Sequence, residues 1–228
     1  MGKYAFLLAD ADNTLFDFPA GEQAALHQVL TEYALPTDAA TLAAYDHINV
    51  ALWAALERGE ISSAALRVLR FERLLTHLQR AGDASALSTR YLEALGEHPI
   101  LLPGAESAVR RWAARVPIAI VTNGISLAQR ARIAHSTISG CIHSLLISEE
   151  VGAPKPDPRM VYAALEALGC REPAHALLLG DSLFADIGAA HNAGIDSCWF
   201  NPAGIRSTTG TPPTYAISSL DEVDALLI

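Results

Sequence analysis

Short, nearly continuous apolar runs recur along the chain, and longer segments with helical spacing separate them. The runs cover Tyr4 to Ala9, Pro117 to Thr122, His143 to Ile147, Ala176 to Leu179, Ser197 to Phe200 and Tyr215 to Ile217. A strand that is apolar at almost every position is typical of a parallel sheet, because both of its faces are buried there. The alternation of such strands with helices predicts an open α/β sheet with helices on both faces.

One interval breaks this alternation, because Ala20 to Leu95 contains no convincing strand. Four segments in it have helical spacing: Glu22 to Tyr33, Asp38 to Glu57, Ser62 to Arg80 and Ser85 to Leu95. Four helices inserted after the first strand predict a small separate domain. We expect residues 19–96 to form this inserted domain and residues 1–18 and 97–228 to form the core domain.

The composition narrows the classes of protein that fit. The chain has 228 residues, 51% of them apolar, and a mean hydropathy of +0.23, which is ample material for a packed core. A net charge of −9 disfavours a nucleic acid polymer as partner, and no apolar stretch is long enough to span a membrane. Three cysteines without metal-site spacing suit a cytoplasmic protein with reduced thiols, which we expect to be a monomer or a homodimer.

Chemically active side chains follow four of the predicted strands. They are, in chain order, Asp10 and Asp12, then Thr122-Asn123-Gly124, then Lys155, and finally Asp181 with Asp186. In open α/β sheets, ligands bind at the carboxyl ends of the strands, so these side chains are expected to converge on one edge. Each short segment alone is more often an ordinary turn or surface loop. Their joint occurrence, each after a predicted strand, indicates a functional site.

Clustered carboxylates repel one another unless a cation neutralises them, and hard oxygen ligands of this kind suit Mg²⁺. A hydroxyl at Thr122, the N–H groups of Asn123 to Ser126 and an ammonium at Lys155 can together hold a phosphate. One of the paired aspartates can attack phosphorus, and the other can carry a proton to the leaving oxygen. The set therefore predicts phosphoryl transfer assisted by a metal.

These motifs resemble those of the haloacid dehalogenase (HAD) superfamily, in its phosphatase branch, over essentially the whole chain. The segments that carry the resemblance are Asp10-Ala11-Asp12-Asn13-Thr14, Val121-Thr122-Asn123-Gly124, Lys155, and Gly180-Asp181-Ser182-Leu183-Phe184-Ala185-Asp186. The resemblance implies a Rossmann-like core, and it implies that the four inserted helices form a cap that closes over the site and selects the substrate.

By the same resemblance, Asp10 is the nucleophile and Asp12 the acid and base. The other implied roles are catalysis and phosphate binding by Thr122 and Lys155, and phosphate binding by Asn123 and Gly124. Mg²⁺, with Mn²⁺ as the alternative, is held by Asp10, the backbone carbonyl of Asp12, and Asp181, with Asp186 in support.

Further segments resemble the subgroup of pyrimidine nucleoside 5′-monophosphatases. They include Thr14-Leu15-Phe16, Asn49 with Leu52-Trp53, Arg70-Phe71-Glu72 and Cys198-Trp199-Phe200-Asn201. The implied substrate is a nucleoside monophosphate, and the candidate specificity residues are Phe16, Asn49, Trp53 and Arg70. The motif departs from many relatives at Asn13, where they have glycine.

Several other functions use the same residues. A phosphatase of another small metabolite, such as a sugar phosphate or phosphoglycolate, would share the whole site, and so would a phosphomutase. A dehalogenase needs the nucleophile but has no need of an acid at Asp12. A non-catalytic binding protein has no need of the complete set of catalytic side chains that this sequence has. The leading hypothesis is therefore a Mg²⁺-dependent phosphomonoester hydrolase, and the resemblance implies a pyrimidine nucleoside monophosphate as its substrate.

Overall fold

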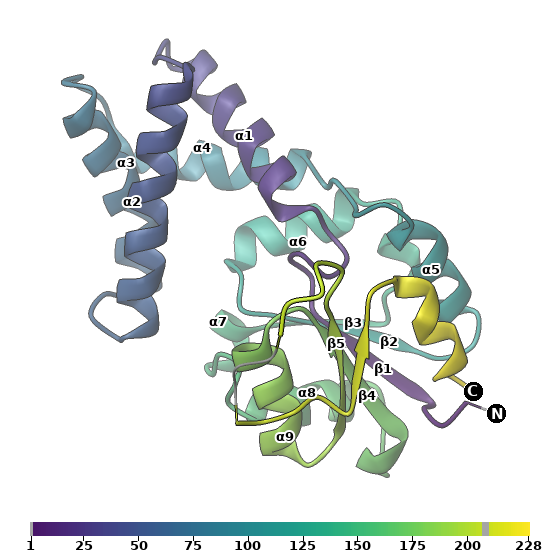
Figure 1. Cartoon of the computed structure of the whole chain (residues 1–228). Coiled ribbons are helices and arrows are strands. Elements are labelled where there is room, and N and C mark those ends of the chain that lie inside the picture. Colours follow the sequence, from purple (N-terminus) through teal and green to yellow (C-terminus); the bar gives the residue numbers. More distant parts are fainter. Residues whose placement is uncertain (1, 207–209) are drawn as a thin grey trace. The chain divides into compact units, whose positions relative to one another are not determined.

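The fold is described from a computed structural model that covers residues 2–206 and 210–228. The chain divides into two compact units (Figure 1). The core unit consists of Met1–Ala20 and Pro99–Ile228, and the helical unit consists of Gly21–His98.

The core unit is built on one parallel sheet, as the apolar runs predict. Its strands are β1 (Phe6–Ala9), β2 (Ile118–Thr122), β3 (Ser144–Ile147), β4 (Ala176–Gly180), β5 (Asp196–Phe200) and β6 (Tyr215–Ile217). They lie in the order β3-β2-β1-β4-β5-β6, and every neighbouring pair is parallel. Because β1 pairs with both β2 and β4, the segment after β1 lies between the ends of two other strands.

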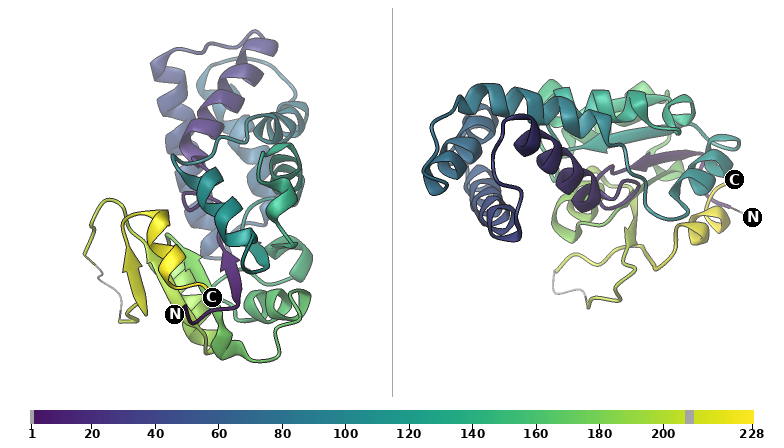
Figure 2. Two further views of the ribbon diagram at one scale, coloured as in Figure 1. Left: turned by 90° about the vertical axis from the view of Figure 1, so that its right-hand side faces the viewer. Right: turned by 90° about the horizontal axis from the view of Figure 1, so that it is seen from above.

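Helices cover both faces of this sheet (Figure 2). They are α5 (Ala105–Ala113), α6 (Ser126–His135), α7 (Ser148–Val151), α8 (Arg159–Ala167) and α9 (Gly188–Ala193). One apolar cluster joins Leu7 and Leu177 to α5 around Trp112. A second cluster, on the other face, joins Leu8 and Leu178 to α8 and α9. Alternate residues of β1 thus face opposite cores, which holds the end of the strand in place.

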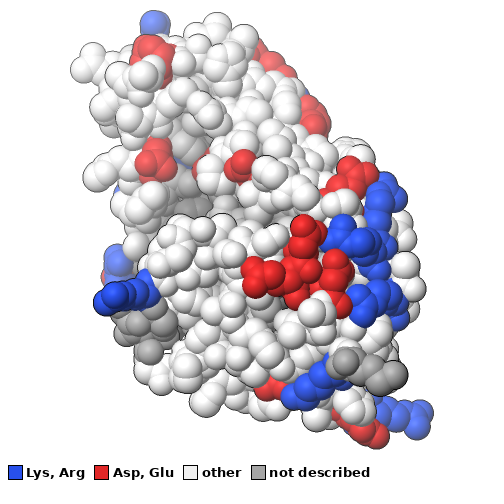
Figure 3. Space-filling view, turned by 45° about the vertical axis from the view of Figure 1, so that its right-hand side comes forward, with Lys and Arg blue, Asp and Glu red and all other residues white. Residues whose placement is uncertain are grey.

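The last helix begins at a capping box, Ser219-Leu220-Asp221-Glu222, and it is a 3₁₀ helix, which is tighter than an α-helix. It spans Leu220–Ala225, which is longer than the roughly three or four residues usual for a 3₁₀ helix. Ser219 and Glu222 exchange the two capping hydrogen bonds. Arg111 of α5 pairs with Asp221 and Asp224 at 2.5 and 2.8 Å. Figure 3 shows basic and acidic side chains lying beside one another on one face of the molecule, so this surface is not a patch of single charge.

The helical unit contains the four inserted helices that the sequence predicts: α1 (Phe18–Glu32, which begins in the core unit), α2 (Ala39–Glu57), α3 (Ser63–His77) and α4 (Ala84–Glu97). Asp38, Ser62 and Asp83 cap the last three with side-chain hydrogen bonds to backbone N–H groups. Inside the unit, the rings of Tyr45, Phe71 and Tyr91 pack against one another with centroids 5.4–5.9 Å apart.

No helix in the described ranges is long and apolar enough to cross a membrane. The three cysteines are free, as their spacing predicts, and Cys198 lies in the core of the sheet.

The aromatic cluster supports a stability prediction for the helical unit. Phe71→Ala removes a fully buried ring, so we expect the free energy of unfolding to fall by roughly 3–5 kcal/mol. Tyr33→Ala is the matched control, because Tyr33 is 41% exposed and its loss is expected to cost less than about 0.5 kcal/mol. Urea unfolding followed by circular dichroism measures both values. Equal losses in the two variants would contradict the packing role of Phe71.

Candidate active site

A buried ammonium joins three segments at the carboxyl edge of the sheet. Lys155 Nζ donates to Asp10 Oδ1 at 2.6 Å, to Asp186 Oδ1 at 2.6 Å and to the carbonyl oxygen of Val121 at 2.7 Å. The side chains of Lys155, Asp10 and Asp186 are all nearly inaccessible to solvent. The end of β1, the end of β2 and the turn after β4 therefore meet at one cation.

Asp186 reaches this position because the turn after β4 makes room for it. A side chain at Gly180 would put its Cβ 2.2 Å from the carboxyl carbon of Asp186. The second oxygen of Asp186 accepts from the backbone N–H of Ser182 at 3.0 Å, within a turn of π-helix at Leu183–Ile187. Such turns are often found at functional sites. Trp199 Nε1 donates to the carbonyl oxygen of Asp181 at 2.8 Å, which fixes the backbone of that residue.

The turn after β1 explains the asparagine at position 13. Asn13 has a φ of 61°, in the left-handed region that glycine and asparagine adopt most readily. Its backbone N–H donates to the carbonyl oxygen of Phe16 at 2.8 Å and closes the turn. Thr14 Oγ1 lies 3.4 Å from Asp10 Oδ2, from inside the same turn. Asn13 thus meets a backbone requirement that glycine would also meet.

The segment after β2 holds the lysine in place. Asn123 accepts from the backbone N–H of Lys155 at 2.8 Å and donates to its carbonyl oxygen at 2.9 Å. Thr122 Oγ1 accepts from the N–H of Gly124 at 3.0 Å, so its own proton can still be donated. The N–H of Ser126 donates to Glu149 at 2.8 Å. The N–H groups of Gly124 and Ser126 are therefore not free, because the Thr122 hydroxyl and the Glu149 carboxylate accept from them. Phosphate binding by Asn123 and Gly124 stays a prediction.

The carboxylate of Asp12 has different partners from that of Asp10. It forms an ion pair with Arg132 through Oδ1 and accepts from Gln129 Nε2 at 2.8 Å through Oδ2. Sequence reasoning missed both partners. Their spacing of three residues puts them on one face of α6, but no local pattern shows that this face meets the turn after β1.

Burial and the charges of neighbouring side chains shift the pKa values of three groups at this site. Burial raises the pKa of Asp10 to about 8, although the Lys155 ammonium acts to lower it. Burial, and then the charge of Asp186, raise the pKa of Asp181 to about 6. Burial acts to lower the pKa of Lys155, but Asp10 and Asp186 outweigh it and hold the pKa above its usual value. The positive charge of Lys155 alone therefore does not offset the burial of these carboxyl groups. A bound cation would supply more positive charge.

The donor set fits a divalent metal. Asp10, Asp181 and Asp186 each offer an oxygen within 4.8 Å of the others. Both oxygens of Asp186 already accept hydrogen bonds, which suits the supporting role predicted for it. These three carboxylates face one ammonium, that of Lys155. This leaves two negative charges, which one divalent cation would neutralise.

The four candidate specificity residues do not share one environment. Phe16 is fully buried in the core unit. Asn49 and Arg70 are buried within the helical unit, where Asn49 donates to Glu22 at 3.0 Å and the Arg70 guanidinium lies over the ring of Tyr91 at 4.5 Å. Trp53 is half-buried. Their roles in specificity stay predictions.

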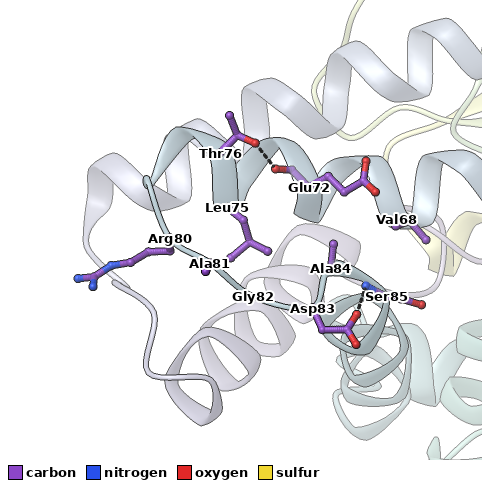
Figure 4. A pocket seen from close by; sticks show the side chains of 10 residues that line it. All are labelled: Val68, Glu72, Leu75, Thr76, Arg80, Ala81, Gly82, Asp83, Ala84 and Ser85. Carbon is purple, nitrogen blue, oxygen red and sulfur yellow. Dashed lines mark hydrogen bonds between the residues drawn. The ribbon is translucent and has the colours of Figure 1, made fainter.

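A pocket of about 520 Å³ opens between α3 and α4 (Figure 4) and contains none of these four residues. It is lined by Val68, Glu72, Leu75, Thr76, Arg80, Ala81, Gly82, Asp83, Ala84 and Ser85. Asp83 already accepts from the N–H groups of Ser85 and Ala86, so the start of α4 offers no open anion site there.

The sequence and the fold are similar to those of known proteins. A model of the haloacid dehalogenase-like hydrolases matches residues 6–194. The pyrimidine 5′-nucleotidase PynA of Streptococcus pneumoniae is 35% identical over 96% of this chain and 93% of its own length. The pyrimidine 5′-nucleotidase YjjG of Escherichia coli is 32% identical over 99% and 98%. The magnesium-bound crystal structure of YfnB from Bacillus subtilis, a protein named as a HAD-hydrolase, superposes with a TM-score of 0.89 at 32% identity, covering 99% of this chain and 100% of that one.

The close approach of Gly180 to Asp186 can be tested directly. We expect Gly180→Ala to displace the Asp186 carboxylate, to lower the free energy of unfolding by roughly 1–3 kcal/mol and to weaken Mg²⁺ binding. Gly140→Ala is the matched control, because a Cβ there meets nothing within 4 Å. Urea unfolding and calorimetric titration with Mg²⁺ measure the two effects. Unchanged Mg²⁺ affinity in Gly180→Ala would show that Asp186 does not support the metal site.

Proposed function

The chain belongs to the haloacid dehalogenase-like hydrolase family, and we propose that it hydrolyses a phosphate monoester through an aspartyl-phosphate on Asp10. The contact of Lys155 Nζ with both Asp10 and Asp186 carries this proposal. It puts a buried carboxylate beside a fixed positive charge at the carboxyl edge of a parallel sheet. A carboxylate nucleophile and a preorganised cation are what transfer of an anionic phosphoryl group requires.

In the first step, an oxygen of Asp10 attacks phosphorus and forms the acyl-phosphate bond, while the bond from phosphorus to the ester oxygen breaks. The departing oxygen takes a proton from the carboxyl group of Asp12. Lys155 stabilises charge on the phosphoryl oxygens, and the Thr122 hydroxyl donates to one of them. Protonation matters most for a poor leaving group such as a nucleoside.

In the second step, water attacks phosphorus and gives a proton to the carboxylate of Asp12. The bond between phosphorus and the Asp10 oxygen breaks, inorganic phosphate leaves, and the Asp10 carboxylate is restored. Asp12 ends the cycle protonated, as it began, so the two steps balance.

We further propose that Mg²⁺, with Mn²⁺ as the alternative, is held by Asp10, Asp181 and the backbone carbonyl of Asp12, with Asp186 in support. The convergence of three carboxylates and the magnesium bound to YfnB support this choice. When bound, the metal supplies positive charge to the phosphoryl oxygens.

The proposed substrate is a pyrimidine nucleoside monophosphate. The names of PynA and YjjG, which align over nearly the whole chain, support this class. Chemistry transfers between relatives more safely than specificity does, so a sugar phosphate or phosphoglycolate is the competing assignment.

Asp10→Asn tests the chemistry. We expect kcat for phosphate release with Mg²⁺ to fall by at least roughly a thousandfold, because an amide cannot form the acyl-phosphate. The change is nearly isosteric, so the circular dichroism spectrum is expected to stay the same. Asp17→Asn is the matched control, since Asp17 lies on the same segment and its side chain accepts from the N–H of Ala20, away from Lys155. A variant at position 10 that kept most of the wild-type rate would exclude the aspartyl-phosphate.

A substrate panel tests the specificity. We expect kcat/KM for uridine and thymidine monophosphates to exceed that for glucose 6-phosphate and phosphoglycolate by at least about tenfold. Phosphate release in the presence of Mg²⁺ measures all four. If the sugar phosphate is as good a substrate as the nucleotides, the nucleotidase assignment fails while the phosphatase assignment stands.

A further inference from the structure

The carboxylate of Asp12 is held at both oxygens by two side chains of α6. Arg132 Nη2 donates to Oδ1, and Gln129 Nε2 donates to Oδ2 at 2.8 Å. Gln129 also accepts from Arg132 Nη2 at 2.8 Å, so the two side chains hold each other. We name Gln129 and Arg132 the Asp12 clamp.

Packing around the clamp keeps it in one arrangement. The Arg132 guanidinium lies 4.7 Å from the ring centroid of Phe16 and 5.7 Å from that of Phe18, and both clamp side chains are nearly inaccessible to solvent. Gly124 leaves the space for Gln129, because a Cβ at position 124 would lie 2.1 Å from Gln129 Nε2. The glycine that follows Thr122 and Asn123 is therefore also a requirement of the clamp.

A carboxylate at position 12 has a reason to need such support. It lies two residues from Asp10, at the edge of the sheet where Asp181 and Asp186 also lie, and its side chain is 26% exposed. Repulsion from those carboxylates would favour rotamers that turn Asp12 toward water. Two fixed donors remove that freedom, and they use only one lone pair on each oxygen. A second lone pair on each oxygen stays available for a proton.

We propose that Gln129 and Arg132 are positioning residues for the proton transfer that Asp12 performs, a role that rests on the function proposed above. The clamp aims the Asp12 carboxyl at the ester oxygen and holds it there through both steps. It touches neither the phosphoryl group nor the attacking water. Phe16 and Phe18 act through the clamp by fixing the plane of the Arg132 guanidinium.

Substrates whose leaving groups differ in basicity distinguish a positioning role of the clamp from a purely structural role. We expect Arg132→Met to lower kcat roughly 10- to 100-fold for uridine monophosphate, and less than about threefold for p-nitrophenyl phosphate, whose leaving group needs no proton. Asp12→Ala is expected to show the same selective loss in larger measure. The double variant with Asp12→Ala is expected to be no slower than Asp12→Ala alone, because both changes remove one function.

Two further variants guard against a folding defect. Gln129→Met removes one donor without removing a buried charge. Its kcat is expected to fall more for uridine monophosphate than for p-nitrophenyl phosphate, but by less than in Arg132→Met. Arg132→Lys keeps the charge and one donor, so it is expected to retain more activity toward uridine monophosphate than Arg132→Met. Arg130→Met is the matched control on the same helix, because Arg130 is exposed and pairs with Glu150.

Equal losses on both substrates, or no loss, in Arg132→Met and Gln129→Met would overturn the clamp while leaving the phosphatase intact. Additive losses in the double variant with Asp12→Ala would overturn it as well. If the wild-type protein released no phosphate from any ester with Mg²⁺, the proposed function would fail first, and the clamp with it.

Discussion

The buried ammonium of Lys155 is the interaction on which the rest of the site depends. It is the shared hydrogen-bond donor for the end of β1, the end of β2 and the turn after β4. A charge of this kind persists in a dry interior only when its partners are close and well aligned. The two apolar clusters on either face of the sheet meet that condition, because they fix the strand ends that carry those partners. Packing and catalysis are thus linked through one side chain.

Much of the fold can be predicted from local sequence pattern, because a strand that is buried on both faces is apolar at almost every position. The runs at Tyr4 to Ala9 and Pro117 to Thr122 become β1 and β2 with boundaries shifted by one or two residues, and the caps at Asp38 and Ser62 begin α2 and α3. The order of the strands is a matter of long-range pairing, which no local pattern shows. The rule that ligands bind at the carboxyl ends of strands predicts the edge where the site lies, but it does not predict the order of the strands.

The candidate site likewise has one part that the sequence predicts and another that it does not. Asp10, Lys155 and Asp186 follow predicted strands, and their convergence is a consequence of parallel pairing. Gln129 and Arg132 lie inside a helix whose polar residues look like an ordinary solvated face, so their contact with Asp12 is visible only in three dimensions. Likewise, Asn13 looks like a departure from the motif until its φ of 61° shows that the turn requires a left-handed residue.

The two aspartates after β1 differ less in chemistry than in surroundings, and the surroundings assign their roles. Asp10 is buried and faces the Lys155 ammonium, so a fixed positive charge lies beside it where a phosphoryl group would arrive. Asp12 is partly open to water and is held by a guanidinium and an amide on a separate helix, which suits a group that must exchange protons with solvent and substrate. Environments that differ this much around identical side chains are how one site performs nucleophilic and acid–base chemistry together.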